Sequence, residues 1–155
     1  MKVSGRTATR LHAHTEKLLA DVGAREDGAA LEGICEKFRV PTECRDLARL
    51  AARAASGAAR GDRLSAEEKL NLLESSDAFR RPQRLADLLR VAEAECYGAK
   101  RWIEQPFASR RALQAALAAA RTVDSAALAA QGGDIPAALR AARVKRIAQA
   151  GEAAA

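Results

Sequence analysis

The chain has 155 residues, enough for one helical domain or two small helical subdomains. Alanine, leucine, arginine and glutamate dominate it and aromatic residues make up only 3%, so the composition favours an all-α fold over a sheet-rich one. The formal net charge of +6 suits a polyanionic partner, but it does not separate RNA from DNA, a membrane surface or plain solubility.

The basic excess lies in the C-terminal third of the chain. Residues 1–99 carry 17 basic and 16 acidic side chains, whereas residues 100–150 carry nine basic side chains against three acidic ones. Contacts with a polyanion are therefore expected to draw mainly on this third.

The three cysteines, Cys35, Cys44 and Cys96, form no CxxC pair and have no histidine near them in the sequence. This pattern predicts neither a disulfide framework nor a zinc site, but small apolar side chains on helix faces in a reducing cytoplasm. No apolar run approaches the roughly 18 residues of a membrane span, so we expect a cytoplasmic protein without a membrane partner. The acid-free, basic start of the chain also fits an organellar transit segment, which is the less favoured alternative.

Apolar residues at helical spacing predict the first three elements. Leu11, Leu18, Leu19 and Val22 predict a first helix that stops at Gly23 and whose start is not defined by the sequence. Asp27 can cap a second helix, and Pro41 ends that helix and opens a third. The residues expected to share the inner faces of the second and third helices are Leu31, Ile34, Cys35 and Phe38, then Leu47, Leu50, Ala51 and Ala54. Residues 55–63, ASGAARGDR, are then expected to form a loop.

A cap and a proline predict the next two helices. Ser65 with Glu68 three residues later is a capping box, and Pro82 marks the start of a fifth helix. The residues expected to be buried here are Leu70, Leu73 and Phe79, then Leu85, Leu88, Leu89 and Ala92. The stretch SSDAFRRPQRL, residues 75–85, therefore straddles a helix junction and places three arginines there.

The C-terminal part is predicted to hold three more helices. One runs from about Ser109, a short alanine-rich one follows Asp124, which can cap it, and the last begins at Pro136 after a QGGDIP break. The expected inner residues are Leu113, Ala116 and Leu117, then Leu139, Ala142 and Ile147, with Arg140, Arg143 and Arg146 on the other side of the last helix. Residues 151–155 are expected to fray, and the whole to be an irregular bundle of about seven or eight helices.

Motifs for catalysis are missing from the sequence. There is no GxxxxGK[ST], no GxGxxG after a strand, no HExxH and no DxD pair. His12 and His14 lie two residues apart, which on a helix separates them by about 200°, so a shared metal is the less favoured interpretation of this pair. We therefore expect no catalytic residue, metal or cofactor in this chain, and basic side chains without catalytic acids indicate binding.

Four blocks of sequence, in this order and at these separations, resemble the C-terminal region of bacterial tRNA nucleotidyltransferases, the CCA-adding enzymes that carry an HD-type domain. They are RVPTECRDLARL (39–50), LLESSDAFRRPQRL (72–85), AEAECYG (92–98) and GGDIPAALRAARVKRIAQA (132–150). The resemblance implies a helical domain over residues 29–150, preceded by a poorly matched N-terminal helix over residues 1–28 and followed by the frayed tail.

The resemblance also implies which activities this chain lacks. Phosphohydrolase members of the family place a metal-binding His-Asp pair after RDLARL, where this sequence has Ala55 and Ser56. Nucleotide transfer, with magnesium and CTP or ATP, resides in an N-terminal catalytic domain that has no counterpart in these residues. Both cofactors are therefore expected only if the chain joins a catalytic domain, and enzymatic activity of the chain itself stays uncertain.

The rest of the chain resembles the helical region of these enzymes that supports the catalytic body and lies along tRNA. The resemblance therefore implies tRNA as the partner. A separate catalytic subunit or another protein is the second partner that it allows. Phosphate contacts suit basic helical surfaces. The candidates are Arg80, Arg81, Arg84, Lys100, Arg101, Arg140, Arg143, Lys145 and Arg146. Asp77 and Phe79 are expected to be structural, and Trp102 to be a core or interface residue in preference to a base-stacking one.

Two other hypotheses remain open. The chain could be a degenerate helical domain that acts as a structural or protein-interaction component of a larger assembly, which predicts an exposed leucine and alanine patch. A metal-dependent phosphohydrolase is conceivable only if His12, His14 and distant acids converge on one metal.

Overall fold

The computed structural model describes residues 28–97, 107–131 and 133–152, in which it shows seven helices and no strand. The helices are α2 (Gly28–Lys37), α3 (Thr42–Ala59), α4 (Ala66–Ser75), α5 (Pro82–Tyr97), α6 (Ala108–Arg121), α7 (Ser125–Gln131) and α8 (Ile135–Glu152). The predicted all-α fold is confirmed. The first predicted helix, residues 11–22, and the capping residue Asp27 lie outside the described residues.

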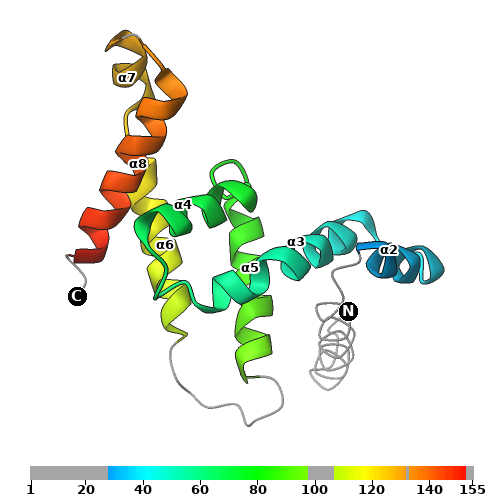
Figure 1. Cartoon of the computed structure of the whole chain (residues 1–155). Coiled ribbons are helices and arrows are strands. Elements are labelled where there is room, and N and C mark those ends of the chain that lie inside the picture. The colour runs from blue at the N-terminus through cyan, green and yellow to red at the C-terminus, as the bar shows by residue number, and fades with distance from the viewer. Residues whose placement is uncertain (1–27, 98–106, 132, 153–155) are drawn as a thin grey trace, which may run out of the picture.

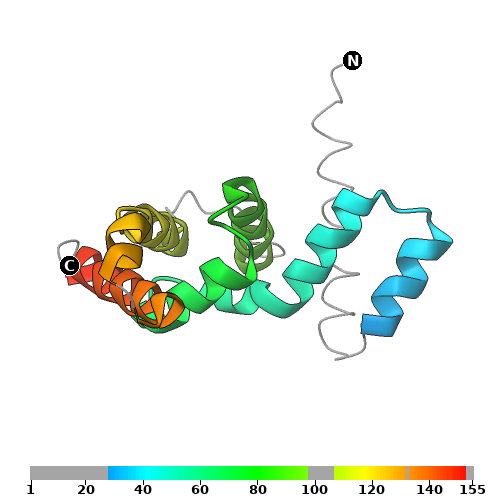
Figure 2. The ribbon, with the colours of Figure 1, turned by 90° about the horizontal axis from the view of Figure 1, so that it is seen from above.

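The helices form an elongated, open arrangement in place of a tight bundle (Figure 1). Helix α3 packs mainly against α5, and α6 packs mainly against α8. Helix α4 packs against α6 and α8 and also contacts α3, so it joins the two pairs. Helix α2 lies against α3 at one end, and the short α7 lies against α8 at the other (Figure 2).

The main core collects leucine and alanine side chains from α3, α4, α5, α6 and α8. Leu50, Leu73, Leu88 and Leu113 have no exposed surface, and Ile147 is the only residue of α8 that is fully buried. Alanines such as Ala58 and Ala92 fill the close approaches between helices. Most of the predicted inner faces of α3 to α6 are therefore confirmed, because apolar spacing follows the helical period there.

A second, much smaller core holds α2 against the start of α3. It consists of the buried Leu31 and Cys35 with Ile34, Val40 and Ala48 packed around them. Phe38 was expected on this inner face, but that prediction is wrong: α2 ends at Lys37, and although the Phe38 amide still donates to the Ile34 carbonyl, its side chain does not join this core. Its side chain is 67% exposed, with the Lys37 amine 5.9 Å from the ring centroid.

The turn that ends α2 is a Schellman motif, in which two amides beyond the helix return to its last free carbonyls. The amide of Arg39 donates to the carbonyl of Glu36, and the amide of Val40 donates to that of Cys35. The motif forces Arg39 into the left-handed region, with φ of 49°. This conformation favours glycine, so the turn carries some backbone strain.

The predicted loop over residues 55–63 is partly wrong, because α3 continues through Ala59. Ser56 and Gly57 suggested a break, but Ala54, Ala55 and Ala58 are all buried and hold this end of the helix in the core. A helix whose apolar face is buried overrides the weak local preference of one glycine. Helix α4 then begins as predicted with a full capping box, since Ser65 and Glu68 exchange backbone-to-side-chain hydrogen bonds of 2.8 and 3.2 Å.

The turn between α3 and α4 is fitted closely against α6. An added Cβ on Gly61 would lie 2.5 Å from Cδ1 of the buried Leu113, so only glycine fits there. The buried hydroxyl of Ser109 lies 2.8 Å from the carbonyl oxygen of Ala59 and 2.9 Å from a carboxylate oxygen of Asp62, and can donate to either. These contacts fix the start of α6 relative to the end of α3.

The last two helices begin with aspartate caps. The carboxylate of Asp124 accepts hydrogen bonds from the amides of Ala126 and Ala127, as predicted, and that of Asp134 accepts one from Ala137. Helix α8 extends through Glu152, two residues into the segment 151–155 for which fraying was expected. Asp134 was not predicted as a cap, although it stands just before the helix.

Candidate nucleic-acid interface

The junction between α4 and α5, residues 76–81, presents the first group of candidate arginines. Helix α4 ends in a second Schellman motif: the amide of Asp77 donates to the Glu74 carbonyl and that of Ala78 to the Leu73 carbonyl. Asp77 takes the left-handed position, with φ of 56°. Aspartate tolerates this conformation better than most residues, which gives it the structural role expected from the sequence.

The junction is held from both sides by the rest of the protein. The side chain of Ser76 is buried and donates to the carbonyl of Leu73, and Ala78 is fully buried. From α6, the guanidinium of Arg121 donates to the carbonyl of Phe79 at 3.0 Å and also lies 3.4 Å from that of Ala78. Sequence analysis missed Arg121, since its partners lie more than 40 residues earlier in the chain. The junction is therefore a fixed turn that holds Arg80 and Arg81 in place.

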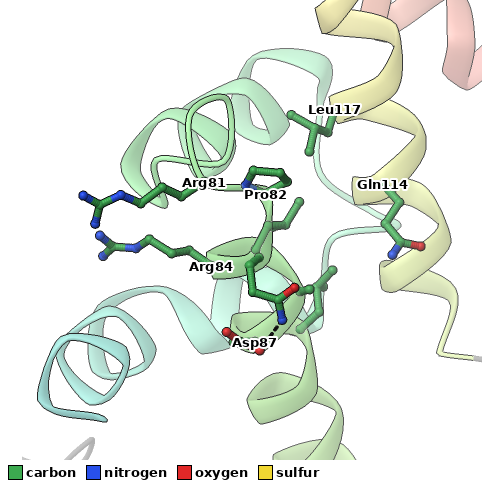
Figure 3. A pocket seen from close by; sticks show the side chains of 10 residues that line it. Arg81, Pro82, Arg84, Asp87, Gln114 and Leu117 are labelled. Atoms are coloured by element: carbon green, nitrogen blue, oxygen red, sulfur yellow. Dashed lines mark hydrogen bonds between the residues drawn. The ribbon is translucent and has the colours of Figure 1, made fainter. Parts of the chain in front are cut away.

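Arg81 and Arg84 extend side by side in the same direction, away from the body of the protein (Figure 3). Behind them runs a groove of about 660 Å³ between the first turns of α5 and helix α6, to which Pro82, Gln114 and Leu117 contribute. Arg81 lies 3.8 Å from a carboxylate oxygen of Asp77, a loose ion pair at a solvent-exposed site. Arg80 and Arg84 have no carboxylate oxygen within 4 Å among the described residues, so both are available to a partner.

Arg140 is used inside the protein, in contacts between α8 and α4. Its guanidinium forms an ion pair with Glu74, a hydrogen bond with the side chain of Asn71, and a longer ion pair of 3.7 Å with Glu67. About a third of the Arg140 side chain remains exposed, at 36%. A phosphate would have to compete with these carboxylates for Arg140.

Arg143 is also engaged, one turn further along α8. Its guanidinium carbon lies 4.2 Å from the centroid of the Phe79 ring, a cation–π contact, and its Nε is buried. Phe79 is half-buried at the edge of the core, so it is structural as predicted. Because Arg143 covers its ring, Phe79 is not free to stack on a nucleic-acid base.

Lys145 and Arg146 lie on the side of α8 that faces α7. Both side chains are exposed, and in the described part of the chain neither has a carboxylate oxygen within 4 Å. They line a cleft of about 510 Å³ together with residues of the α6–α7 turn and of α7. The four arginines and lysines named on α8 therefore divide into an inner pair, Arg140 and Arg143, and an outer pair, Lys145 and Arg146.

Several other sequence candidates lie outside the described residues. Lys100, Arg101 and Trp102 fall in the segment between α5 and α6, and His12 and His14 fall before α2. Their roles stay predictions. The remaining candidates come together as two groups, one at the α4–α5 junction and one on α8.

The positions at which the resemblance would place a His-Asp pair, Ala55 and Ser56, fall in the last two turns of α3. Ala55 is buried in the main core and Ser56 is exposed. Neither side chain is a metal ligand of the kind that a phosphohydrolase needs. Over the described residues, the structure contains no group of three or more histidine, cysteine or acidic side chains placed to hold a metal ion. None of the described helices is long and apolar enough to cross a membrane.

Comparison with known proteins gives relatives that share one description. The chain is 40% identical over 124 residues to the Multifunctional CCA protein of Burkholderia cenocepacia strain HI2424, which covers 77% of this chain and 30% of that protein. It is 37% identical over 128 residues to the Multifunctional CCA protein of Janthinobacterium sp. strain Marseille, over 77% of this chain and 31% of the relative. With that of Paracidovorax citrulli it shares 43% identity over 101 residues, 65% of this chain and 24% of the relative.

No protein-family model and no solved structure matches the chain. The chain thus spans about 30% of the length of the curated relatives that it matches. Their shared description confirms the resemblance to CCA-adding enzymes that the four sequence blocks carry. This chain is therefore a relative of the Multifunctional CCA proteins, related to them over less than a third of their length.

Proposed function

We propose that this chain is a cytoplasmic tRNA-binding helical module in tRNA 3′-end processing, which corresponds to the C-terminal region of CCA-adding tRNA nucleotidyltransferases and does not add nucleotides itself. The similarity to Multifunctional CCA proteins carries this proposal. The basic excess over residues 100–150 supports it, since RNA binding gains most of its affinity from phosphate contacts.

The geometry favours contacts with the RNA backbone at the α4–α5 junction. Arg80 and Arg81 stand exposed on a fixed turn, and Arg84 stands half-buried on the first turn of α5. The nearby aromatic ring, that of Phe79, is covered by Arg143. A-form RNA displays phosphates and 2′-hydroxyls along its shallow groove, so such a surface can bind it without reading its sequence.

The chemistry is assigned to a catalytic domain outside these residues. Ala55 and Ser56 replace the ligands that an HD-type hydrolase would use, so no hydrolytic step is proposed here. Magnesium and CTP or ATP would enter only with a catalytic domain, supplied by a separate nucleotidyltransferase subunit or by the same protein.

The test is binding of the purified chain to tRNA that lacks its CCA end, against a hairpin RNA of equal length, over a series of salt concentrations. We expect tighter binding to tRNA, and an affinity that falls with salt with a slope of several phosphates. Replacing Arg80 and Arg84 with glutamine should weaken binding and reduce the slope by about one for each phosphate that the variant no longer neutralises.

Arg53→Gln is the control, because Arg53 is an exposed arginine on α3 that forms no ion pair with a described carboxylate and belongs to neither group. It removes one positive charge by the same arginine-to-glutamine change and should leave tRNA affinity nearly unchanged. Arg140 and Arg143 are poor choices for this test, since their loss would also loosen α8.

Equal weak binding to both RNAs, or none, would contradict the proposal and favour the structural or protein-interaction hypothesis. That hypothesis predicts an exposed apolar patch. Within the described residues, Phe38 is the only large hydrophobic side chain that is exposed, while α7 exposes several alanines.

A further inference from the structure

The cleft between α7 and α8 is a second candidate site, and its lining differs from that of the α4–α5 junction, where the arginines stand. Its walls come from the α6–α7 turn, from α7 and from the outer face of α8. Val123, Leu128 and Ala142 give it apolar, half-buried walls, while Lys145 and Arg146 stand at its edge. With a volume of about 510 Å³, it falls within the range of pockets that hold small molecules.

Its two cations form no ion pair within the part of the chain that the structure describes. Asp124 is the acidic residue that lines the cleft, and its Oδ1 already accepts hydrogen bonds of 2.9 and 3.1 Å from the first free amides of α7. The carboxylate therefore compensates the N-terminal end of that helix. Lys145 and Arg146 form no ion pair with it or with any other described carboxylate, which leaves two positive charges for a ligand.

The lining selects a ligand with one anionic and one flat or apolar part. A double-stranded stem is a convex rod that presents phosphates outward, so it can touch the edge of the cleft but cannot enter it. An unpaired nucleotide can turn its base into the cleft against the aliphatic walls while its flanking phosphates stay at the edge, next to the two cations.

We propose that the α7–α8 cleft binds one unpaired nucleotide of a structured RNA, with the base between Leu128 and Ala142 and the phosphates at Lys145 and Arg146. This inference rests on the proposed function and adds a site at which the chain distinguishes an RNA with an unpaired nucleotide from a plain duplex. The junction arginines would bind the duplex backbone, and the cleft would supply the preference for RNA that has an unpaired nucleotide.

The experiment compares a blunt RNA duplex with the same duplex carrying one bulged adenosine. For the natural chain we expect the bulged duplex to bind about tenfold more tightly, the order of magnitude that burial of one base against apolar walls can give. Lys145→Gln with Arg146→Gln should abolish this preference. Arg53→Gln, which removes one positive charge at an exposed site on α3, should preserve it.

A second pair of variants tests the cleft without changing charge. Ala127 is exposed on α7 and lines the cleft, so Ala127→Leu should fill it and remove the preference, with the affinity for the blunt duplex unchanged. Ala129→Leu adds the same side chain on the same helix at an exposed position that does not line the cleft, and should behave as the natural chain does. Circular dichroism of each variant checks that it is folded.

The outcomes separate this inference from the proposed function. Tight tRNA binding with equal affinity for the two duplexes would overturn the cleft assignment and leave the proposed function standing. A preference for the bulge that survives in Ala127→Leu and in the Lys145, Arg146 variant would place the unpaired nucleotide elsewhere. No binding to tRNA or to either duplex would overturn both.

Discussion

Arginines in this chain bind backbone carbonyls, pair with side chains of another helix, or have no described partner. Which of these applies depends on residues far away in the sequence. Arg121 and Arg140 contact groups that lie more than 40 and 60 residues away in sequence, respectively. Arg80, by contrast, has no such partner among the described residues. A charge count alone therefore overstates the positive charge that α8 can offer to a ligand, because Arg140 is shared with the carboxylates of α4.

Two glycines, four residues apart, should respond in opposite ways to replacement by alanine. Gly57 lies inside α3, where a Cβ would meet only Cδ1 of Leu72 at 3.8 Å, an ordinary contact. Gly57→Ala should raise the free energy of unfolding by about 0.5–1 kcal/mol, since alanine loses less backbone entropy in a helix. Gly61→Ala should lower it by about 1–3 kcal/mol, because Leu113 is buried and cannot move away from the new methyl group.

Urea unfolding of the two variants beside the natural chain measures both effects. They serve as controls for each other, since the chemical change is the same. A Gly61→Ala variant as stable as the natural chain would show that the turn between α3 and α4 can shift away from α6.

At the level of the single element, the capping box of α4 makes stability depend on pH. Hydrogen bonding to Ser65 lowers the pKa of the Glu68 carboxyl below its ordinary value of 4.5. The larger contribution comes from the Ser65 backbone amide and the smaller one from the Ser65 side chain. The folded protein therefore binds this proton less readily than the unfolded chain does. The stabilisation by Glu68 is present above about pH 4.5, and it is lost as the pH falls through the lower pKa of the folded state.

Glu68→Gln should therefore make the protein less sensitive to acid. The difference in unfolding free energy between neutral pH and about pH 3 should be smaller in the variant than in the natural chain. Denaturant unfolding at the two pH values measures this difference. An unchanged difference would mean that Glu68 titrates alike in the folded and unfolded states.

The end of α2 can be stabilised by a single substitution. Arg39 has φ of 49° in a Schellman turn, the position that glycine fills most often in such turns. Its side chain is exposed, and no described carboxylate pairs with it. Arg39→Gly should therefore raise stability by up to about 1 kcal/mol through relief of strain, offset by the greater freedom of glycine in the unfolded chain.

Thermal unfolding followed by circular dichroism is the measurement for Arg39→Gly. Arg39→Ala is the matched control, because it removes the same side chain but keeps the Cβ that causes the strain. A gain in the alanine variant equal to that in the glycine variant would assign the effect to the lost charge.

Elements with a local signal were predicted well from the sequence. Ser65 with Glu68, Asp124 and Pro82 each sit beside the helix end that they predict, and the structure places helices there. The failures are of another kind. The end of α3 depends on burial of Ala55 and Ala58 by other helices, and Phe38 depends on where α2 stops, so neither was readable from neighbouring residues.

The candidate site was predictable to a similar extent. The sequence located the arginines at the α4–α5 junction, because SSDAFRRPQRL contains its own turn and helix signals. It could not divide the cations of α8 into an inner and an outer pair, since that division depends on Phe79 and on the acids of α4. The α7–α8 cleft likewise exists only after the chain has folded back on itself.

On the scale of the whole molecule, the two separate cores predict two levels of stability. The small core around Leu31 and Cys35 joins α2 mainly to α3, while the main core unites five helices. Less apolar surface is buried in the small core, so α2 should open locally without unfolding the rest. Cys35, only 2% exposed, reports this opening.

The test uses a variant in which the exposed Cys44 and Cys96 are replaced by serine, so that Cys35 is the one remaining thiol. Its reaction with a thiol reagent should be slow, but much faster than global unfolding allows. Leu31→Ala should speed the reaction with little effect on the main thermal transition. A rate that rises with denaturant in step with global unfolding would show that the molecule unfolds as one unit.

The side-chain partners of the basic residues also determine how freely these residues can vary in evolution. Arg140 bridges Asn71 and Glu74 through different nitrogens, and Arg143 lays a flat cation on Phe79, two tasks for which an ammonium group is a poor replacement. Arg80 and Arg146, with no such partners among the described residues, need only a positive charge. Among natural variants of this chain, arginine and lysine should therefore exchange at positions 80 and 146, while positions 140 and 143 keep arginine.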